Sequence, residues 1–198
     1  MTDFIHTHWI ELTGASLGLL YLYFEYKADI KIWVTGILMS LFYVYVYIEN
    51  AFYAFATINV YYIIAQVYGW IKWTRKTGHE KPLCHMPLKY IAPLSGITVL
   101  LFIFLAFILS KMGESAVAWG DSFITSLSII AIWMLSRKYI EQWIPLIVAN
   151  LASVFIFYYQ GLYPTSLMYA VYFVVSIFGY FNWKRMIKKL TIPKSIDN

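Results

Sequence analysis

Charged residues are scarce in this chain, since Asp, Glu, Lys and Arg make up only 13% of its 198 residues. A soluble domain carries roughly 25% charged residues. The single cysteine, Cys84, excludes an internal disulfide, and we interpret it as an ordinary loop thiol. The N-terminal stretch has no basic region before an apolar core and no small-residue cleavage site, so we expect no signal peptide. The scarcity of charge, with 61% hydrophobic residues, predicts an integral membrane protein.

Motifs of enzymatic chemistry are missing as well. The sequence has no phosphate-binding glycine loop, nucleophile elbow, HExxH pattern or catalytic carboxylate pair. The four histidines lie in terminal or loop segments. We therefore expect no enzyme, no metal and no cofactor. The acidic residues lie near the ends of apolar segments, whereas a proton relay usually needs one inside the membrane, so facilitated diffusion is the simpler expectation.

Long apolar segments account for most of the chain. Seven of them are bounded by charged or turn-forming residues, at approximately 9–26, 32–48, 52–71, 90–110, 119–135, 142–159 and 163–183. A helix needs ~20 residues to cross ~30 Å of hydrocarbon, and shorter helices suffice where the bilayer is thinned. We predict an all-α membrane protein of seven transmembrane helices, with residues 1–198 forming a single membrane domain.

Basic residues accumulate in alternate gaps between these segments. All but one of the 15 Lys and Arg residues follow the first, third, fifth or seventh segment, and the exception is Lys111. Because basic loops stay in the cytoplasm, we expect the N-terminus outside and the C-terminus inside. The net charge of +5 is therefore a topology signal and not a nucleic-acid surface.

An offset of 110 residues aligns the first three segments with the last three without a gap. Identical pairs include Ser16/Ser126, Trp33/Trp143, Ile37/Ile147, Tyr62/Tyr172, Gly69/Gly179 and Trp73/Trp183. The pattern predicts two three-helix repeats, 9–76 and 119–186, around a linker helix at 89–111. Because the linker crosses the membrane once, both repeats enter it in the same direction, as in parallel transporter repeats. This 3+1+3 arrangement resembles the SWEET architecture.

Polar and aromatic residues recur on single helical faces within the two repeats. A carboxamide in hydrocarbon costs several kcal/mol unless it is hydrogen-bonded, so these faces should point into the bundle. Hydrogen bonding between helices, worth ~0.6 kcal/mol per bond, is one explanation. A substrate cavity between the repeats is the other, and we favour it. The predicted substrate-binding residues are Trp33, Ser40, Asn59, Tyr62, Gln66, Trp143, Asn150, Tyr169 and Tyr172.

Two stretches resemble a known family. "VYGWIKW" (67–73) and "SRKYIEQWIPLIVANLASVFIFYYQGLYPTSLMY" (136–169) are similar to the Pnu family of bacterial vitamin transporters, which includes nicotinamide riboside (PnuC) and thiamine (PnuT) branches. The resemblance extends from Trp9 to Trp183. It implies a SWEET-like fold in the bacterial inner (cytoplasmic) membrane and facilitated uptake by alternating access. It also implies trapping of the vitamin by a cytoplasmic kinase, and it suggests a homotrimer.

The family pattern fits this chain with some departures. The resemblance implies that Trp143 and Asn150 contact the substrate. Leu146, Met39 and Asn59 stand where the riboside pattern commonly has Trp, Asn and Gln. Because fewer hydrogen-bonding groups suit thiamine better than a ribose, and because "FEYKADIKIWVTGILM" (24–39) looks closer to the thiamine branch, we predict thiamine. Nicotinamide riboside is the alternative.

Two further classes stay open at this stage. One is a vitamin-binding membrane sensor that moves nothing, and the other is a sugar transporter of the same fold. The aromatic residues around Asn150 suit a flat cationic ring better than a neutral sugar. The expected partners are a small-molecule vitamin and the lipid bilayer, with no nucleic acid.

Overall fold

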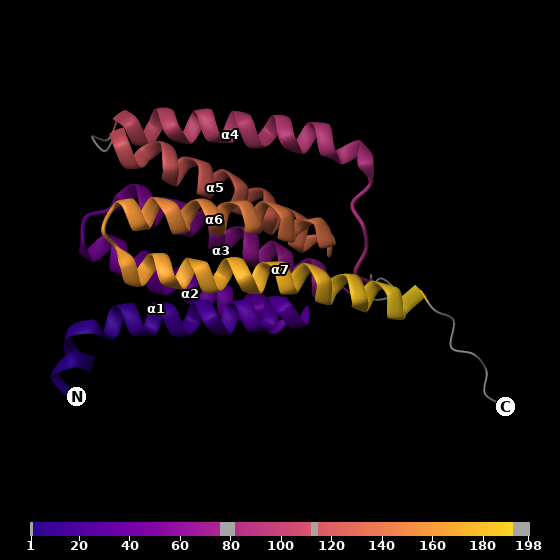
Figure 1. Ribbon diagram of the computed structural model, residues 1–198, viewed down its shortest axis with the longest axis horizontal. Helices are drawn as coiled ribbons and strands as arrows, with labels where there is room; N and C mark the ends of the chain where they lie inside the picture. The colour runs from indigo at the N-terminus through magenta and orange to yellow at the C-terminus, as the bar shows by residue number, and fades with distance from the viewer. Residues whose placement is uncertain (1, 76–81, 112–114, 192–198) are drawn as a thin grey trace. The chain divides into compact units, whose positions relative to one another are not determined.

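A computed structural model describes residues 2–75, 82–111 and 115–191 of the chain (Figure 1). Within these ranges the chain forms seven α-helices and two short 3₁₀ helices. They divide into two compact units, Met1–Arg75 and Lys76–Asn198. The chain is therefore all-α, as predicted.

The first unit contains three successive helices. They are α1 (Thr2–Lys27), α2 (Lys31–Glu49) and α3 (Tyr53–Thr74). Short connections make consecutive helices antiparallel neighbours, with α1 packed against α2 and α2 against α3 (Figure 1).

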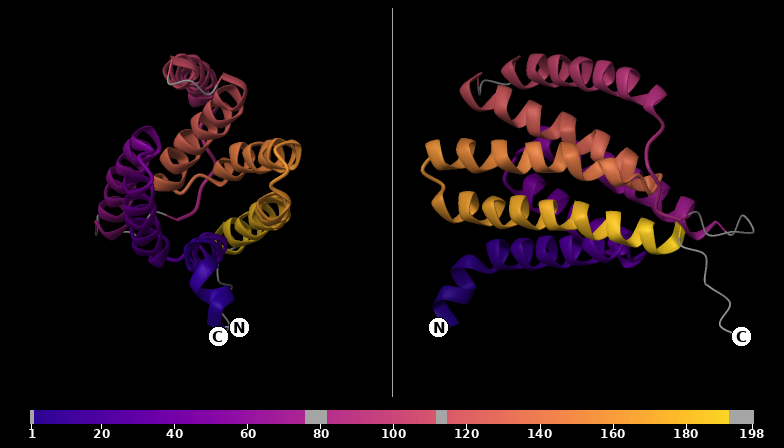
Figure 2. Two further views of the ribbon diagram at one scale, coloured as in Figure 1. Left: turned by 90° about the vertical axis from the view of Figure 1, so that its left-hand side faces the viewer. Right: turned by 45° about the vertical axis from the view of Figure 1, so that its right-hand side comes forward.

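The second unit contains the other four α-helices and both 3₁₀ helices. The elements are η1 (Leu88–Tyr90), α4 (Ile91–Lys111), α5 (Ser115–Ser136), η2 (Ile140–Gln142), α6 (Trp143–Tyr159) and α7 (Tyr163–Thr191). Each α-helix packs against the next along the chain, and Figure 2 shows α6 and α7 running side by side. The 3₁₀ helix η2 turns the chain from α5 into α6.

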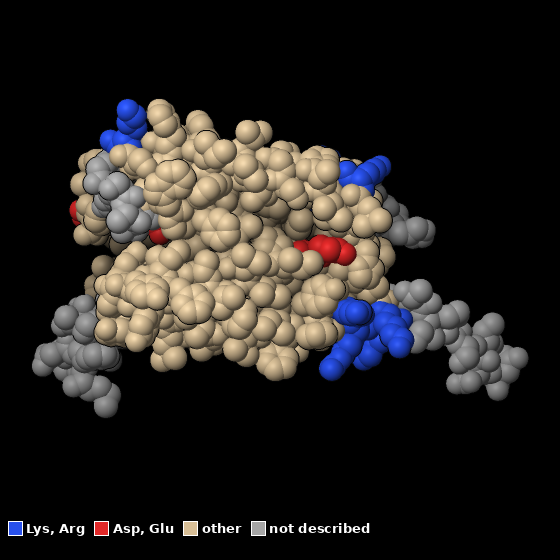
Figure 3. Space-filling model, turned by 45° about the horizontal axis from the view of Figure 1, so that its top comes forward, with Lys and Arg blue, Asp and Glu red and all other residues tan. Residues whose placement is uncertain are grey.

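Five of the described segments are long and apolar enough to cross a membrane. They are Lys31–Glu49, Leu88–Lys111, Ala118–Ser136, Ile140–Tyr159 and Tyr163–Lys189. Two helices that we also predicted as spans, α1 and α3, are not among the five, since polar residues such as Glu25 and Gln66 lower their hydropathy. In Figure 3, Lys and Arg gather near helix ends, and the surface between them carries mostly uncharged residues, as a lipid-facing surface requires.

Buried serines mark the contacts between helices in the second unit. Ser122, Ser153 and Ser176 are fully buried, and each donates its hydroxyl to the carbonyl four residues earlier in its own helix. Small side chains of this kind allow helices to approach closely in a membrane, where apolar burial does not drive association.

Four helix ends share one backbone geometry. The φ angles of Ala28, Ala51, Lys138 and Gly161 are 52°, 60°, 62° and 76°. This left-handed conformation is characteristic of the Schellman motif that closes many helices. Its hydrogen bonds recur 110 residues apart, for example from Asp29 N to Phe24 O and from Tyr139 N to Met134 O.

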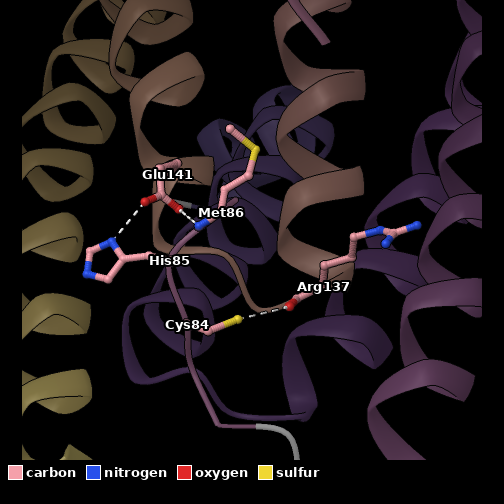
Figure 4. A network of polar contacts seen from close by, with 5 residues as sticks. All are labelled: Cys84, His85, Met86, Arg137 and Glu141. Carbon is pink, nitrogen blue, oxygen red and sulfur yellow. Dashed lines mark hydrogen bonds and ion pairs between the residues drawn. The ribbon is translucent and has the colours of Figure 1, made fainter. Parts of the chain in front are cut away.

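The segment before α4 is fixed to the turn between α5 and α6 (Figure 4). The amide of Cys84 donates to the carbonyl of Lys138 over 3.0 Å, and the amide of Ile140 donates to the carbonyl of Cys84 over 3.1 Å. The carboxylate of Glu141 accepts the amide of Met86 at 2.7 Å and lies 2.9 Å from Nδ1 of His85. Residues 82–90 are thereby anchored within the second unit.

Candidate substrate site

In the first unit, a tryptophan at the start of α2 packs onto a glycine of α3. Trp33 is fully buried, and its indole occupies the space where a side chain at Gly69 would begin. Trp73 meets the Trp33 ring edge-on, with ring centres 5.4 Å apart and planes at 83°. Position 69 therefore accommodates glycine, whereas any side chain there would overlap the Trp33 ring.

The second unit repeats this packing. Trp143 is also fully buried, and a Cβ on Gly179 would lie only 2.5 Å from its ring. The ring of Trp183 meets that of Trp143 edge-on at 5.7 Å and 90°. Both predicted substrate-contacting tryptophans are thus enclosed by protein in this conformation.

A carboxamide and a serine join the same two helices in each unit. In the first unit, Nε2 of Gln66 on α3 donates to Oγ of Ser40 on α2 over 3.1 Å. In the second, Nδ2 of Asn150 on α6 donates to Oγ of Ser176 on α7 over 3.0 Å. The two pairs occupy positions 110 residues apart, but the carboxamide and the serine have exchanged helices.

Gln66 retains an acceptor that the described part of the chain does not satisfy. Its side chain is 4% exposed, and its Oε1 is buried without a hydrogen-bond partner among the described residues. That oxygen rests against Gly36 of α2, where any side chain would overlap it. A buried unpaired acceptor costs ~1–3 kcal/mol, so this oxygen is suited to receive a donor from a ligand.

Asn59 does not join the pair formed by Gln66. It is half-buried, and its Nδ2 donates to the carbonyl of Phe55 within α3 at 2.9 Å. Tyr62, one turn before Gln66, is also half-buried. The predicted polar and aromatic face of α3 thus contains one buried carboxamide, Gln66, and two half-buried side chains, Asn59 and Tyr62.

Aromatic rings form a stacked group in the second unit. Tyr169 on α7 stacks on Phe157 of α6, with ring centres 5.1 Å apart and planes at 12°. Tyr172 meets Tyr169 edge-on at 5.7 Å. Both tyrosines were predicted from the sequence, but Phe157 was not, because a phenylalanine in an apolar helix carries no distinguishing signal.

The basic end of the first unit carries one perturbed group. Nζ of Lys27 lies 4.6 Å from the ring centre of Tyr23. A side-chain hydrogen bond with Tyr23 is the main cause that raises the pKa of Lys27. Lys27 therefore keeps its proton to a higher pH than an ordinary lysine does.

The fold is that of a multi-pass membrane transporter. It is similar to the crystal structure of the vitamin B3 transporter PnuC, with a TM-score of 0.73, 23% sequence identity and coverage of 94% of this chain and 85% of that one. The chain belongs to the nicotinamide mononucleotide transporter family, whose model matches residues 8–185.

Two named relatives support the same family. The nicotinamide riboside transporter PnuC of Escherichia coli (strain K12) is 26% identical over 202 residues, covering 88% of this chain and 84% of the relative. PnuC of Haemophilus influenzae is 24% identical over 187 residues, covering 91% and 81%.

These comparisons confirm the predicted Pnu family and the prediction of a transporter and not an enzyme. They also confirm a location in the bacterial inner membrane, with several membrane-spanning helices. They do not support thiamine, the substrate that we predicted first, and they favour the riboside alternative. That prediction gave weight to Met39 and Asn59, but it missed the open acceptor of Gln66 two turns after Asn59 on α3.

Proposed function

We propose that this chain transports nicotinamide riboside by facilitated diffusion with alternating access. The observation that carries the proposal is the carboxamide–serine pair found between the same two helices of both units. The names of the relatives support the choice of vitamin. The proposed binding residues are those predicted from the sequence, namely Trp33, Ser40, Asn59, Tyr62, Gln66, Trp143, Asn150, Tyr169 and Tyr172.

The chemistry of the riboside matches these side chains. Its pyridinium ring is cationic and flat, which suits aromatic faces such as those of Tyr169 and Tyr172. Its amide and hydroxyl groups both donate and accept hydrogen bonds, as Gln66 and Asn150 do. We assign recognition of the polar groups to the carboxamides. The two buried indoles of Trp33 and Trp143 shape the helix pairs on which those carboxamides lie.

The proposal includes the parallel 3+1+3 repeat, with repeats at 9–76 and 119–186, a linker helix at 89–111 and one membrane domain over 1–198. The matched left-handed residues Ala28/Lys138 and Ala51/Gly161 support it, as do the matched tryptophan–glycine contacts. The distribution of basic residues supports an external N-terminus and a cytoplasmic C-terminus. We extend the proposal to a homotrimer and to trapping of the vitamin by a cytoplasmic kinase.

Binding and counterflow together test this function. Tryptophan fluorescence of the purified protein is titrated with nicotinamide riboside and, separately, with thiamine. The protein in liposomes is then loaded with unlabelled vitamin and given labelled vitamin outside. We expect binding and counterflow with the riboside only. Binding without counterflow would indicate a sensor, and a response to thiamine alone would overturn the assigned substrate.

A further inference from the structure

One arginine at a helix end has no carboxylate partner among the described residues. Arg137 directly follows the membrane-span candidate Ala118–Ser136, so it lies where a helix leaves the bilayer. Its guanidinium lies over the indole of Trp133, 4.2 Å from the ring centre. The side chain is half-buried, and its Nε is enclosed without a hydrogen-bond partner in the described part of the chain. A partly buried charge is costly unless an opposite charge or hydrogen bonds compensate for it.

The acid of the following turn, Glu141, is engaged elsewhere. One of its carboxylate oxygens accepts the amide of Met86 at 2.7 Å, and the other lies 2.9 Å from Nδ1 of His85. Figure 4 shows the Arg137 side chain extending away from this carboxylate. Contact with an indole uses the face of a guanidinium and leaves the N–H groups at its edge, which match the oxygens of a phosphate. Arg137 can therefore donate to an anion from outside the chain.

A second cation lies beside the same aromatic rings. Tyr90 meets Trp133 edge-on, with ring centres 6.1 Å apart. Nζ of Lys89 lies 5.4 Å from the ring centre of Tyr90. Leu88 and Ile91, on either side of this pair in the chain, are exposed apolar residues at the start of the next span. Two cations, an aromatic pair and apolar side chains at the bilayer edge together suit the phosphate and the acyl chains of a phospholipid.

The matched place in the first unit is built differently. An offset of 110 places Tyr23 and Lys27 opposite Trp133 and Arg137, and Nζ of Lys27 lies 4.6 Å from the ring centre of Tyr23. Tyr23 also hydrogen-bonds Lys27, and the carboxylate of Asp29 acts on the same lysine. In the second unit an indole and a tyrosine stand at these two positions, and neither supplies a carboxylate. Both units thus end a helix with a cation over an aromatic ring, but only the first places an acid two residues after it.

We propose that Arg137, together with Lys89, binds the phosphate of an anionic phospholipid at the end of α5. The guanidinium donates to two phosphate oxygens, Trp133 holds the guanidinium flat, and Lys89 adds a second positive charge. The acyl chains lie along the exposed apolar side chains of Leu88 and Ile91. In the proposed orientation this lipid belongs to the cytoplasmic leaflet. None of these residues is among the proposed substrate-binding residues, so the inference goes beyond the proposed function.

Native mass spectrometry of the purified protein tests this site by counting bound lipids. The probes are dioleoylphosphatidylglycerol, which is anionic, and dioleoylphosphatidylcholine, which has the same tails and phosphate but also a cationic choline. We expect the wild type to bind the first molecule of the anionic lipid at least about tenfold more tightly, which corresponds to ~1.4 kcal/mol. Arg137→Gln should erase this preference by weakening the anionic lipid alone. Arg137→Lys, which keeps the charge but not the planar fork, should weaken that lipid partly.

A matched variant and a competitor separate the possible outcomes. Lys188→Gln removes one positive charge from an exposed site in the last turn of α7 and should change neither affinity. An equal loss in Lys188→Gln would indicate general charge attraction and overturn the inference. An equal loss of both lipids in Arg137→Gln would assign a structural role and overturn it as well.

Three further results would also overturn the inference. They are an unchanged preference in Arg137→Gln, full affinity for the anionic lipid in Arg137→Lys, and no preference in the wild type. The last two comparisons need no Arg137→Gln protein, so they decide the matter even where that variant does not fold. Displacement of the anionic lipid by millimolar inorganic phosphate would assign a free anion to the site and overturn the choice of a lipid.

Discussion

Asn150 on α6 donates a hydrogen bond of 3.0 Å to Ser176 on α7, in the opposite direction to the matched bond of the first unit. There Gln66, on the second helix of the pair, donates to Ser40 on the first. Each unit thus keeps one carboxamide and one serine while exchanging the helices that carry them. Within each unit, the exchange leaves the bond between the two helices in place and reverses its direction.

Removing the Asn150 carboxamide should abolish transport without preventing folding. In Asn150→Leu, the lost bond to Ser176 costs ~0.6 kcal/mol and at most ~2, which a folded bundle tolerates. We expect uptake of labelled nicotinamide riboside to fall to background at normal membrane expression. Asn50→Leu is the control, because Asn50 is an exposed carboxamide at the end of α2. Normal uptake by Asn150→Leu would contradict the assigned site.

Filling the space beside the buried indoles should destabilise the protein. A methyl group in Gly69→Ala would overlap the Trp33 ring, so the ring and its neighbours must move, at a cost of ~1–3 kcal/mol. A Cβ on Gly96 of α4 would meet nothing within 4 Å, which makes Gly96→Ala the control. Thermal unfolding in detergent measures both. An equal melting temperature for Gly69→Ala and the wild type would refute the packing described.

Glycine should stabilise a helix end that now holds an alanine. Ala51 has φ 60°, a conformation that costs an L-residue roughly 1–2 kcal/mol, so Ala51→Gly should raise the melting temperature. Gly161→Ala makes the opposite change at the matched turn and should lower it. Ala65→Gly, inside α3, is the control and should destabilise by ~1 kcal/mol. Stabilisation by Ala65→Gly or by Gly161→Ala would exclude this explanation.

The proposed orientation predicts which turns react from outside the cell. In a Cys84→Ser background, a cysteine at Tyr159, which is 85% exposed beside the α6–α7 turn, should react with a membrane-impermeant maleimide on intact cells. A cysteine at His85, whose side chain is 58% exposed, should react only after lysis. The reverse labelling pattern would show that the chain crosses the membrane in the opposite orientation.

Hydropathy located the helices but not where all of them end. The segment predicted at 163–183 became α7, which continues to Thr191, because lysines and arginines sustain a helix as readily as apolar residues do. Loss of hydropathy marks the end of the bilayer, whereas a helix ends where its backbone turns. The turn after α1 illustrates this, since Ala28 adopts a left-handed conformation without the glycine that usually signals one.

The periodic pattern found Ser40, Gln66 and Asn150, but not what each contacts. Ser176 was not among the predicted binding residues, because a serine in a membrane helix is common at helix contacts. Glu25 was interpreted as an acid at a segment end, since position along the chain does not reveal whether a helix face is covered. Trp143 was expected beside the substrate, and its burial against Gly179 became evident only from the packing of α6 on α7.

The anchoring of residues 82–90 by Glu141 has a mechanical consequence for α4. That helix begins directly after the anchored segment and packs against α5, so it travels with the second unit. The hydrogen bonds of Cys84 and Glu141 act as a splint, so the start of α4 cannot shift away from the α5–α6 turn unless these bonds break.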